Sequence, residues 1–487
     1  MSLEEIRSIR LLKLEKLKQA GVNPYPVSAC PDVTLEEAVD NFAKLAKKKR
    51  VTLAGRIIAK RGQGAILFVD IFDGTGKFQA VFKKDEMEES VFGLFEETTD
   101  NGDFIEVSGS FFTTKRKEKS LLAKDWKMLC KTLRPLPEKW HGLTDTEERF
   151  RKRYLDILMN EEVRKRFVLR SRIVSELRKV LDKENFLEVE TSMLQPLAGG
   201  ANAEPFKTRH NALDMDLYLR IAPEIDLKKL LIGGYRKVYE IGRSFRNEGI
   251  DVTHNPEFTT VEWYEAYSDA KRQREFLEKV LKTVVKGVVG KNKIEFDAKE
   301  IDFSGKFAVV SYFELLQRYA LIPEPAKASM DDLKLKATQL GIKPEKGDTV
   351  EKLMDSIYKK TARPKLVQPT FVVDYPANYI PLAKKKEGSD TLVDAFQLVI
   401  GGFEVTKAFS ELNDPVDQRE RFALQEKNKK EGDAEAQEAD EAFLEALEYG
   451  MPPAGGVGLS IDRMAMLLGN VKNIREVVFF PTMRPKT

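Results

Sequence analysis

Cysteine and histidine are scarce in this chain of 487 residues, which contains two cysteines and three histidines. Cys30 and Cys130 lie too far apart for a metal-ligand motif. This spacing argues against a structural zinc site and favours a reducing compartment, which we expect to be the cytoplasm. No apolar run reaches the roughly 18 residues of a membrane span, and the first residues lack the apolar core of a signal peptide. We therefore expect no membrane association.

Neither sign of charge dominates, because 81 basic residues oppose 78 acidic residues and leave a net charge of +3. A bulk polycation is excluded, so any nucleic-acid-binding surface has to be local. The sequence also lacks a phosphate-binding loop of the GxxxxGK[ST] type and a Ser-His-Asp arrangement. With 42% hydrophobic and 33% charged residues, the chain is expected to form two or three globular domains.

The first third of the chain predicts a helix followed by a small barrel. Residues 3–20 carry apolar residues at helical spacing, and five β-rich runs follow within residues 51–135. Such a series favours a five-stranded OB-type barrel, whose middle strands bind single-stranded nucleic acid. Phe68 could stack on a base while Arg61 and Gln79 bond its edge. The pattern alone, however, favours Phe68 as ordinary core and Arg61 as ordinary surface.

The segment 242–264 carries more charge than a core-filling hairpin would need. It follows an apolar run and contains Arg243, Arg246, Glu248, Glu257 and Glu262. Unpaired charges are costly to bury, so we expect this segment to bind a charged ligand.

Further charged residues follow other predicted strands. Glu224 comes directly after the strand 215–221, where a solvated glutamate at a helix start is an equally good interpretation. Glu404 and Glu411 flank Lys407 in the second of two strands joined by a Gly-Gly turn. A glycine-rich segment, 455–463, ends in Arg463 and opens an apolar helix, which would bring a cation into a cleft.

These clusters predict a reaction between ATP and a cationic carboxylic acid. Arg246 and Arg463 carry guanidinium forks suited to phosphate, and Phe258 can stack on a nucleobase. Glu404 can hold magnesium against phosphate oxygens. Three more carboxylates have no phosphate role and predict a cationic second substrate: Glu224, Glu262 and Glu411. Without a protein nucleophile, catalysis would rest on positioning and charge stabilisation.

The chain resembles the class II aminoacyl-tRNA synthetases. The sequence Phe-Arg-Asn-Glu at 245–248 is similar to their motif 2, residues 456–463 to motif 3 and residues 186–191 to motif 1. Longer phrases resemble the bacterial-type, class IIb lysyl-tRNA synthetases over almost the whole chain; they lie at 153–156, 199–201, 221–224, 247–250, 254–259 and 410–415.

The resemblance implies an α+β fold, a homodimer and ATP-dependent activation of L-lysine followed by transfer to tRNA(Lys). We expect an N-terminal helix and OB-fold anticodon-binding domain at 1–140 and a class II catalytic domain at 141–487. Its sheet would be antiparallel, with six to seven strands flanked by helices. The lysine-rich region 270–365, which shows only weak helical periodicity, is expected to be a helical insertion within that domain.

The resemblance also assigns roles to individual residues. Catalysis would depend on Arg246, Glu248 and Arg463. ATP would be bound by Arg246, Glu248, His254, Asn255, Phe258, Glu404 and Arg463. Lysine would be bound by Gly200, Glu224, Arg246, Glu262, Tyr264 and Glu411. The anticodon would be read by Arg61, Phe68, Gln79 and Glu118. Magnesium would be held by Glu404 and Gln397.

Four positions depart from the family pattern. Ser192 replaces a proline of motif 1, and Ser460 replaces a glycine of motif 3. Gln397 stands where the family has a second metal-binding glutamate, and Lys407 stands where it has an asparagine of the lysine pocket. Since one change removes a negative charge and the other adds a positive one, we hypothesise that the Lys407 ammonium partly replaces a magnesium ion. Lys407 pointing to solvent, or repelling lysine so that the preferred amino acid has shifted, are the alternatives.

Two other functions compete with tRNA charging. A lysyl-transfer enzyme acting on a protein is one, although relatives of that kind lack the N-terminal barrel. A tRNA-binding or regulatory paralogue with a decayed catalytic domain is the other, and the intact Arg246, Glu248, Glu404, Glu411 and Arg463 argue against it.

Overall fold

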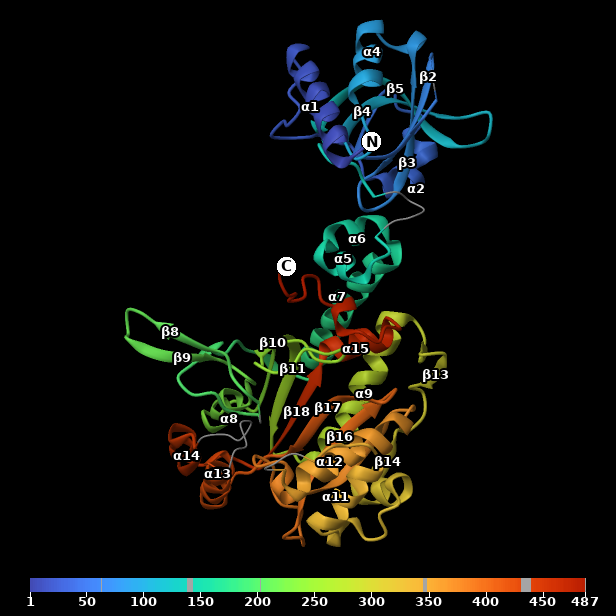
Figure 1. The fold of residues 1–487 in the computed structure, drawn as a ribbon. Coiled ribbons are helices and arrows are strands. Elements are labelled where there is room, and N and C mark those ends of the chain that lie inside the picture. The colour runs from blue at the N-terminus through green and yellow to red at the C-terminus, as the bar shows by residue number, and fades with distance from the viewer. Residues whose placement is uncertain (63, 138–142, 202, 345–347, 431–438, 487) are drawn as a thin grey trace. The chain divides into compact units, whose positions relative to one another are not determined.

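The computed structural model describes residues 1–62, 64–137, 143–201, 203–344, 348–430 and 439–486 (Figure 1). The chain divides into two compact units, Met1–Leu143 and Thr144–Thr487. The domain boundary expected at 140/141 lies outside the described residues. Residue 202 and residues 345–347, the latter within the expected helical insertion, lie outside them as well. No helix among the described residues is long and apolar enough to cross a membrane.

The first unit contains a closed barrel of five strands in the order β1-β2-β3-β5-β4. The bounds are β1 (Val51–Arg61), β2 (Ile66–Phe72), β3 (Lys77–Lys83), β4 (Phe104–Thr113) and β5 (Lys119–Cys130). Only the β3/β5 pair is parallel. Side chains alternate along β2: Leu67, Val69 and Ile71 point into the core, while Phe68 is half-buried on the outer side. The five predicted strands are confirmed, and the interpretation of Phe68 as core is wrong.

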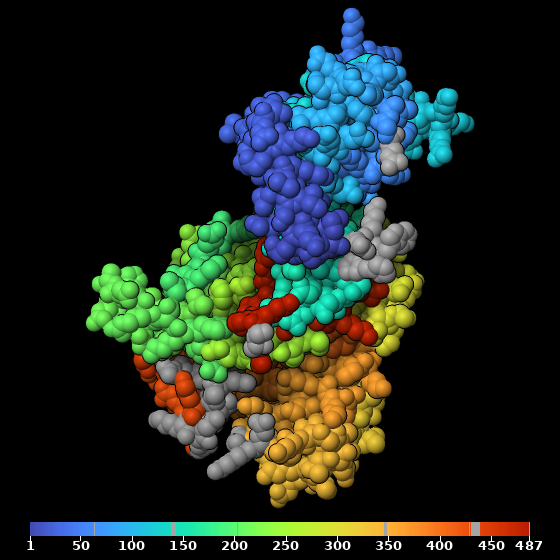
Figure 2. All heavy atoms as spheres, turned by 45° about the horizontal axis from the view of Figure 1, so that its top comes forward, coloured from blue at the N-terminus to red at the C-terminus, as the bar shows by residue number. Residues whose placement is uncertain are grey.

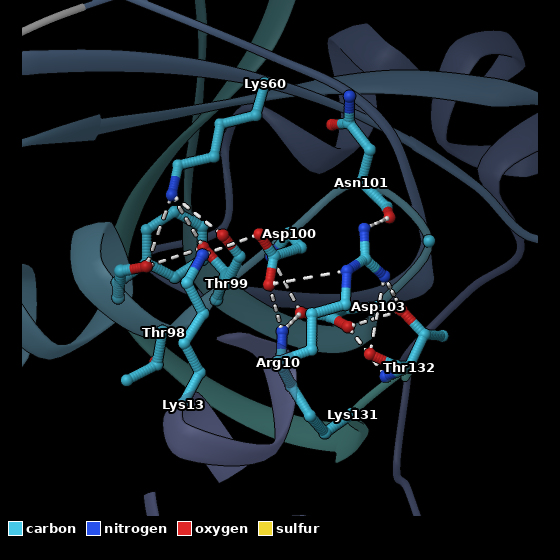
Figure 3. A network of polar contacts seen from close by, with 12 residues as sticks. Arg10, Lys13, Lys60, Thr98, Thr99, Asp100, Asn101, Asp103, Lys131 and Thr132 are labelled. Atoms are coloured by element: carbon cyan, nitrogen blue, oxygen red, sulfur yellow. Dashed lines mark hydrogen bonds and ion pairs between the residues drawn. The ribbon is translucent and has the colours of Figure 1, made fainter. Parts of the chain in front are cut away.

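Helices surround this barrel, and α1 (Leu3–Gln19) is held to it by a polar network (Figure 3). Arg10 donates to Thr132 Oγ1 over 2.7 Å and to the carbonyl of Asn101 over 3.0 Å. The side chains of Lys131 and Asp103 are fully buried and lie 2.8 Å apart. The remaining helices of this unit are α2 (Leu35–Asp40), α3 (Phe42–Leu45) and α4 (Glu89–Thr98).

The second unit is built on an eight-stranded sheet in the order β14-β15-β16-β17-β18-β11-β10-β6. The bounds are β6 (Leu187–Glu188), β10 (Lys237–Phe245), β11 (Glu257–Ala266), β14 (Ala308–Ser311), β15 (Thr370–Pro376), β16 (Leu392–Ile400), β17 (Phe403–Ser410) and β18 (Ala454–Ser460). The strands from β15 to β10 are antiparallel, whereas β14 and β6 pair in parallel at the two edges. The expected antiparallel sheet of six to seven strands is therefore corrected to a mixed sheet of eight. The two edge strands have four and two residues and carry little sequence signal.

Alternation along the strands separates the two faces of this sheet. Val261 and Trp263 point into a core formed with α7 (Glu161–Lys183), α9 (Ala270–Val289) and α15 (Ile461–Leu468). Tyr264, on the opposite face, belongs to a second core with α8 (Glu224–Ile232), α12 (Val350–Thr361) and α14 (Glu441–Glu448). Glu262 shares the face of Tyr264. This second face therefore carries the polar residues.

The region 270–365 is helical only in part, which corrects the expected helical insertion. It contains α9, α10 (Tyr312–Leu315), α11 (Met330–Gln339) and α12, but also the hairpin β12 (Lys293–Phe296) and β13 (Lys299–Asp302) and the edge strand β14. Leu277, Val284 and other residues of α9 pack in the main core. The apolar spacing of α9 is that of a core helix, so part of this region is integral to the sheet rather than peripheral.

The second unit also contains a smaller sheet of three strands in the order β7 (Leu194–Gln195), β9 (Met215–Leu219) and β8 (Lys207–His210). Its β8–β9 hairpin projects from the body of that unit, as Figures 1 and 2 show in green. The other helices of this unit are α5 (Thr146–Arg151), α6 (Arg153–Met159) and α13 (Pro415–Lys430).

Replacing Lys131 should destabilise the barrel unit. In Lys131→Met the fully buried Asp103 loses its ammonium partner, and removal of one member of a buried ion pair costs about 3–5 kcal/mol. We expect this loss in urea unfolding, together with faster amide exchange in α1. The control is Lys16→Met, which removes an ion pair to Glu97 whose side chains are 53% and 55% exposed, and should cost less than about 1 kcal/mol. Equal stability of the two variants would contradict this assignment.

Candidate functional site

A cavity of about 290 Å³ opens on the polar face of the eight-stranded sheet. It brings together eleven of the residues predicted from the sequence: Gly200, Glu224, Arg246, Glu248, His254, Asn255, Phe258, Glu262, Tyr264, Glu404 and Arg463. They come from β11, β17, α8, α15 and the connecting loops. Residues separated by more than 260 positions in the sequence therefore surround one space. Its size suits a small ligand.

The β10–β11 hairpin supplies the first cation of the cavity. Its strands pair up to Phe245 and Glu257, and the Arg246 backbone N–H then donates to the Pro256 carbonyl over 2.8 Å. The Arg246 guanidinium lies 5.0 Å from the centre of the Phe258 ring. This cation–π contact keeps the guanidinium inside the cavity. The loop beyond Arg246 carries Glu248, which is exposed and faces the same space.

The second cation stands at the start of α15. Ser460 is the N-cap of this helix, and its hydroxyl accepts the backbone N–H of Arg463 over 3.2 Å. The side chain that departs from the family glycine therefore closes the first helical turn. The Arg463 guanidinium donates to the Glu404 carbonyl over 2.6 Å and lies 3.3 Å from His254 Nε2. Two guanidinium groups thus enter the cavity from different elements.

The opposite end of the cavity contains carboxylates and an internal cation. Lys228 is fully buried on α8, with its Nζ 2.7 Å from Glu224 Oε1 and 2.5 Å from Glu411 Oε2. Burial alone would lower the pKa of Lys228, but the two carboxylates raise it, so the ammonium is kept. Glu411 is not among the described residues that line the cavity, and it lies behind them as a partner of Lys228.

Glu262 is the carboxyl group of this end that has no cation beside it. Its only hydrogen bond among the described residues comes from the Tyr264 hydroxyl, over 3.2 Å. Burial, and secondarily the charge of Glu224, raises the pKa of Glu262 to about 8. The carboxyl group is therefore largely protonated at neutral pH. A ligand ammonium would favour its ionised form.

Two glycines allow the backbone to approach these groups. Gly200 has φ +88°, which L side chains rarely adopt, and a Cβ there would lie 3.1 Å from the Glu224 Cβ. A Cβ on Gly456 would lie 2.1 Å from Glu411 Oε1 and 2.4 Å from a ring carbon of Tyr264. The backbone of β18 therefore forms the floor of the acidic end.

Gln397 does not reach the cavity. It is 3% exposed, its Oε1 accepts the Tyr375 hydroxyl over 2.9 Å, and it is not among the described residues that line the space. No group of three or more His, Cys, Asp or Glu side chains in the described part of the chain has the geometry of a metal site. Glu404 lines the cavity and forms no ion pair with any described residue. One carboxylate of this kind fits a magnesium ion that arrives bound to phosphate, whereas a second ligand at Gln397 does not fit.

The four predicted anticodon residues lie in the barrel. Arg61 is opposite Phe68 across β1 and β2, and its guanidinium lies 2.7 Å from Asp70. Asp70 is in turn opposite Gln79, whose amide oxygen accepts the Ser120 hydroxyl over 2.9 Å. Glu118 precedes β5 and is exposed. The structure thus places the four on adjoining strands and the loop beside them.

Sequence reasoning missed Lys228, which holds Glu224 and Glu411 together. Its spacing of four residues from Glu224 on a predicted helix was the available signal, since such pairs share a helix face. The contact with Glu411 joins residues far apart in the sequence and had no local signal. Taken together, the cavity offers two guanidinium forks at one end and a carboxylate cluster at the other. This pattern suits a phosphate-containing ligand and a cationic one.

Comparisons with known proteins agree with this geometry. Residues 145–484 match the family model for tRNA synthetases class II (D, K and N), and residues 51–129 match that for the OB-fold nucleic acid binding domain. The lysine–tRNA ligases of Carboxydothermus hydrogenoformans and Pelotomaculum thermopropionicum are each 45% identical, covering 99% of this chain and 99% and 96% of their own lengths. That of Moorella thermoacetica is 43% identical over 99% of this chain and 98% of its own. The chain belongs to the lysine–tRNA ligase family of class II tRNA synthetases.

Proposed function

We propose that this protein is a lysine–tRNA ligase that activates L-lysine with ATP and transfers it to the 3′ end of tRNA(Lys). The observation that carries the proposal is the polarity of the cavity. Arg246 and Arg463 stand at one end, and Glu224 and Glu262 lie at the other, with Glu411 behind them as a partner of Lys228. Membership of the family supplies the identity of the amino acid.

Lysine would lie between these two ends. Gly200 and Glu224 would take its α-amino group, since the backbone and the carboxylate adjoin each other there. Glu262, Tyr264 and Glu411 would surround its ε-ammonium, with Glu411 acting beside Lys228. Arg246 would bridge the lysine carboxylate and the α-phosphate of ATP.

ATP would bind against the guanidinium end. The adenine ring would stack on Phe258, and Glu248, His254, Asn255 and Arg463 would contact the nucleotide. Glu404 would hold a magnesium ion carried by the phosphates, where it would supply charge neutralisation.

The chemistry follows from the positions of these groups. The lysine carboxylate attacks the α-phosphorus in line and pyrophosphate leaves, giving lysyl-adenylate. The terminal hydroxyl of the tRNA then attacks the carbonyl carbon of the adenylate and AMP leaves. Arg246 faces the phosphorus-bound oxygens on which charge builds up. No protein nucleophile is needed, because the residues act through orientation and charge stabilisation.

The other parts of the chain would serve the tRNA and the assembly. Phe68 is only half-buried on the outer side of the barrel, so a base can stack on it, and Arg61, Gln79 and Glu118 would read the anticodon beside it. A cytoplasmic homodimer is proposed, with the barrel unit binding the anticodon and the second unit catalysing. Three apolar side chains in and just after the motif-1 segment are exposed: Leu187 (47%), Met193 (45%) and Leu194 (47%). Exposed apolar side chains that lie close together suit a subunit contact.

A regulatory paralogue without activity, and an enzyme with a shifted amino-acid preference, are the competing proposals. ATP–pyrophosphate exchange across a panel of amino acids separates them. We expect exchange that depends on L-lysine. Glu411→Gln should reduce kcat/KM for lysine by at least about tenfold, because the group facing the ε-ammonium can no longer ionise and Lys228 loses a partner. Exchange with no amino acid would support the paralogue, and exchange with another amino acid the shifted preference.

Lysine binding should strengthen as the pH rises towards 8. The pKa of Glu262 is about 8, so below that pH a proton has to leave when the ε-ammonium binds. Lysine affinity measured by calorimetry should rise by up to about tenfold per pH unit between pH 6.5 and 8 and then level off. Proton release should appear as a dependence of the binding enthalpy on the ionisation enthalpy of the buffer.

Glu262→Gln is the matched variant for this measurement. It should bind lysine more weakly and with a flatter pH profile. The same raised pKa makes the folded protein bind more protons than the unfolded chain between pH 4.5 and 8, so the free energy of unfolding should fall as pH rises over that range. An unchanged slope in Glu262→Gln would contradict the assignment of the proton to this residue.

A further inference from the structure

Lys407 is a cation of the reaction cavity for which the described residues offer no counter-ion. It lies on β17 and lines the cavity together with Arg246 and Glu404. No carboxylate of the described residues lies within 4.0 Å of its Nζ, in contrast to Lys228, which has two partners. Its Nζ lies over the ring of Tyr379, 5.7 Å from the ring centre. Placing an ammonium group in a partly desolvated site with no carboxylate beside it costs free energy, because the lost hydration is not compensated.

Strand register places Lys407 opposite Glu262 across an empty position. Glu262 on β11 pairs with Gly458 on β18, and Gly458 pairs with Lys407 on β17. Cross-strand partners share a face, and two strand spacings separate the backbones of Glu262 and Lys407 by about 10 Å. Because Gly458 has no side chain, the Glu262 carboxyl extends over it, with its Cδ 3.7 Å from the place that a Cβ would take. One face of the sheet therefore carries a carboxyl group and an ammonium two strands apart, which suits a ligand with a cationic and an anionic group.

We propose that Lys407 binds the substrate oxyanions at the point of reaction, which are the lysine carboxylate and the α-phosphate of ATP. The proposal rests on the proposed function and adds a second cation to Arg246. Both oxyanions are negative and approach one another in the first step, so repulsion between them has to be neutralised. Lys407 performs part of the neutralisation that would otherwise require a second metal ion, for which Gln397 offers no free ligand atom.

Local structure supports a role for Lys407 towards a ligand rather than towards the fold. The contact with Tyr379 is compatible with a charged ammonium and leaves its three N–H donors free among the described residues. Gln397 lies opposite Lys407 on the neighbouring strand, but its Oε1 accepts the Tyr375 hydroxyl and forms no hydrogen bond with the Lys407 ammonium among the described residues. Burial lowers the pKa of Lys407 below its ordinary value, and Glu404 and Glu224 offset only part of this shift. An arriving oxyanion acts in the same direction as these carboxylates.

The first test compares the binding of L-lysine with that of cadaverine, the same diamine without a carboxylate, in the absence of ATP and metal. Lys407→Met should weaken L-lysine by about tenfold to a hundredfold, the size of one charged hydrogen bond, and leave cadaverine unchanged. A second titration measures ATP alone in EDTA. Weaker ATP binding in the variant assigns Lys407 to the α-phosphate, and weaker lysine binding assigns it to the carboxylate. If neither ligand is affected, the proposal is overturned.

Three controls keep the result interpretable. Lys407→Arg preserves the charge and should recover most of the lost affinity. Lys279→Met, on α9 with a side chain 62% exposed, should change neither titration. Thermal unfolding establishes that Lys407→Met is folded; should it not fold, Lys407→Asn replaces it. Lysine-dependent pyrophosphate exchange by the unmodified protein is measured first. Its absence refutes the proposed function, whereas exchange with unchanged binding in the variants refutes only the role of Lys407.

The magnesium dependence of exchange tests the consequence for metal. The double variant Lys407→Asn/Gln397→Glu loses the ammonium at position 407 and gains a carboxylate at position 397. We expect this variant to need a several-fold higher free magnesium concentration for half-maximal exchange, and to bind ATP more weakly than the unmodified protein in EDTA. An unchanged magnesium requirement together with unchanged ATP binding would overturn the claim that the Lys407 ammonium supplies charge neutralisation in place of a metal ion.

Discussion

The contact of Lys228 with Glu224 and Glu411 is the interaction on which the catalytic unit depends. It joins α8 to the end of β17 through a fully buried ammonium, so one helix and the sheet are fixed to each other at the acidic end of the cavity. Two buried carboxylates without a cation would each face a large desolvation cost. Lys228 offsets part of that cost and orients both carboxyl groups before any substrate arrives. The pocket is thus preorganised for a positive charge.

Alternation of side chains along the strands then explains how one sheet serves packing and chemistry together. In β11, Val261 and Trp263 fill the core beneath α9, while Glu262 and Tyr264 point into the cavity. Of the charged residues on the strands of the hairpin 242–264, Glu262 points into the cavity, whereas Arg243 and Glu257 lie on the opposite face and pair with each other over 2.9 Å. Arg246 lies in the loop that follows β10, whereas Glu262 lies within β11, opposite Glu240 of β10.

Much of this could be predicted from sequence because the signals are local. The five barrel strands follow from alternation and turn residues, and the clusters around Arg246, Glu404 and Arg463 follow from charges beside strands. The contact of Lys228 with Glu411 could not, since it depends on packing between distant segments. Gln397 illustrates the same limit, because its orientation is set by Tyr375 on a neighbouring strand. The parallel edges β6 and β14 are too short for periodicity to mark them.

Gly456 gives this pocket an unusual resistance to redesign. Because the floor beneath Glu411 and Tyr264 is main chain, no smaller residue exists that would deepen it, and any larger one collides with both side chains. Laboratory evolution towards bulkier or longer amino acids therefore has to proceed through the walls, at β17 and α8. An inhibitor that packs against this floor would contact main-chain atoms, which a point mutation cannot remove. Resistance to such compounds would have to arise elsewhere in the cavity.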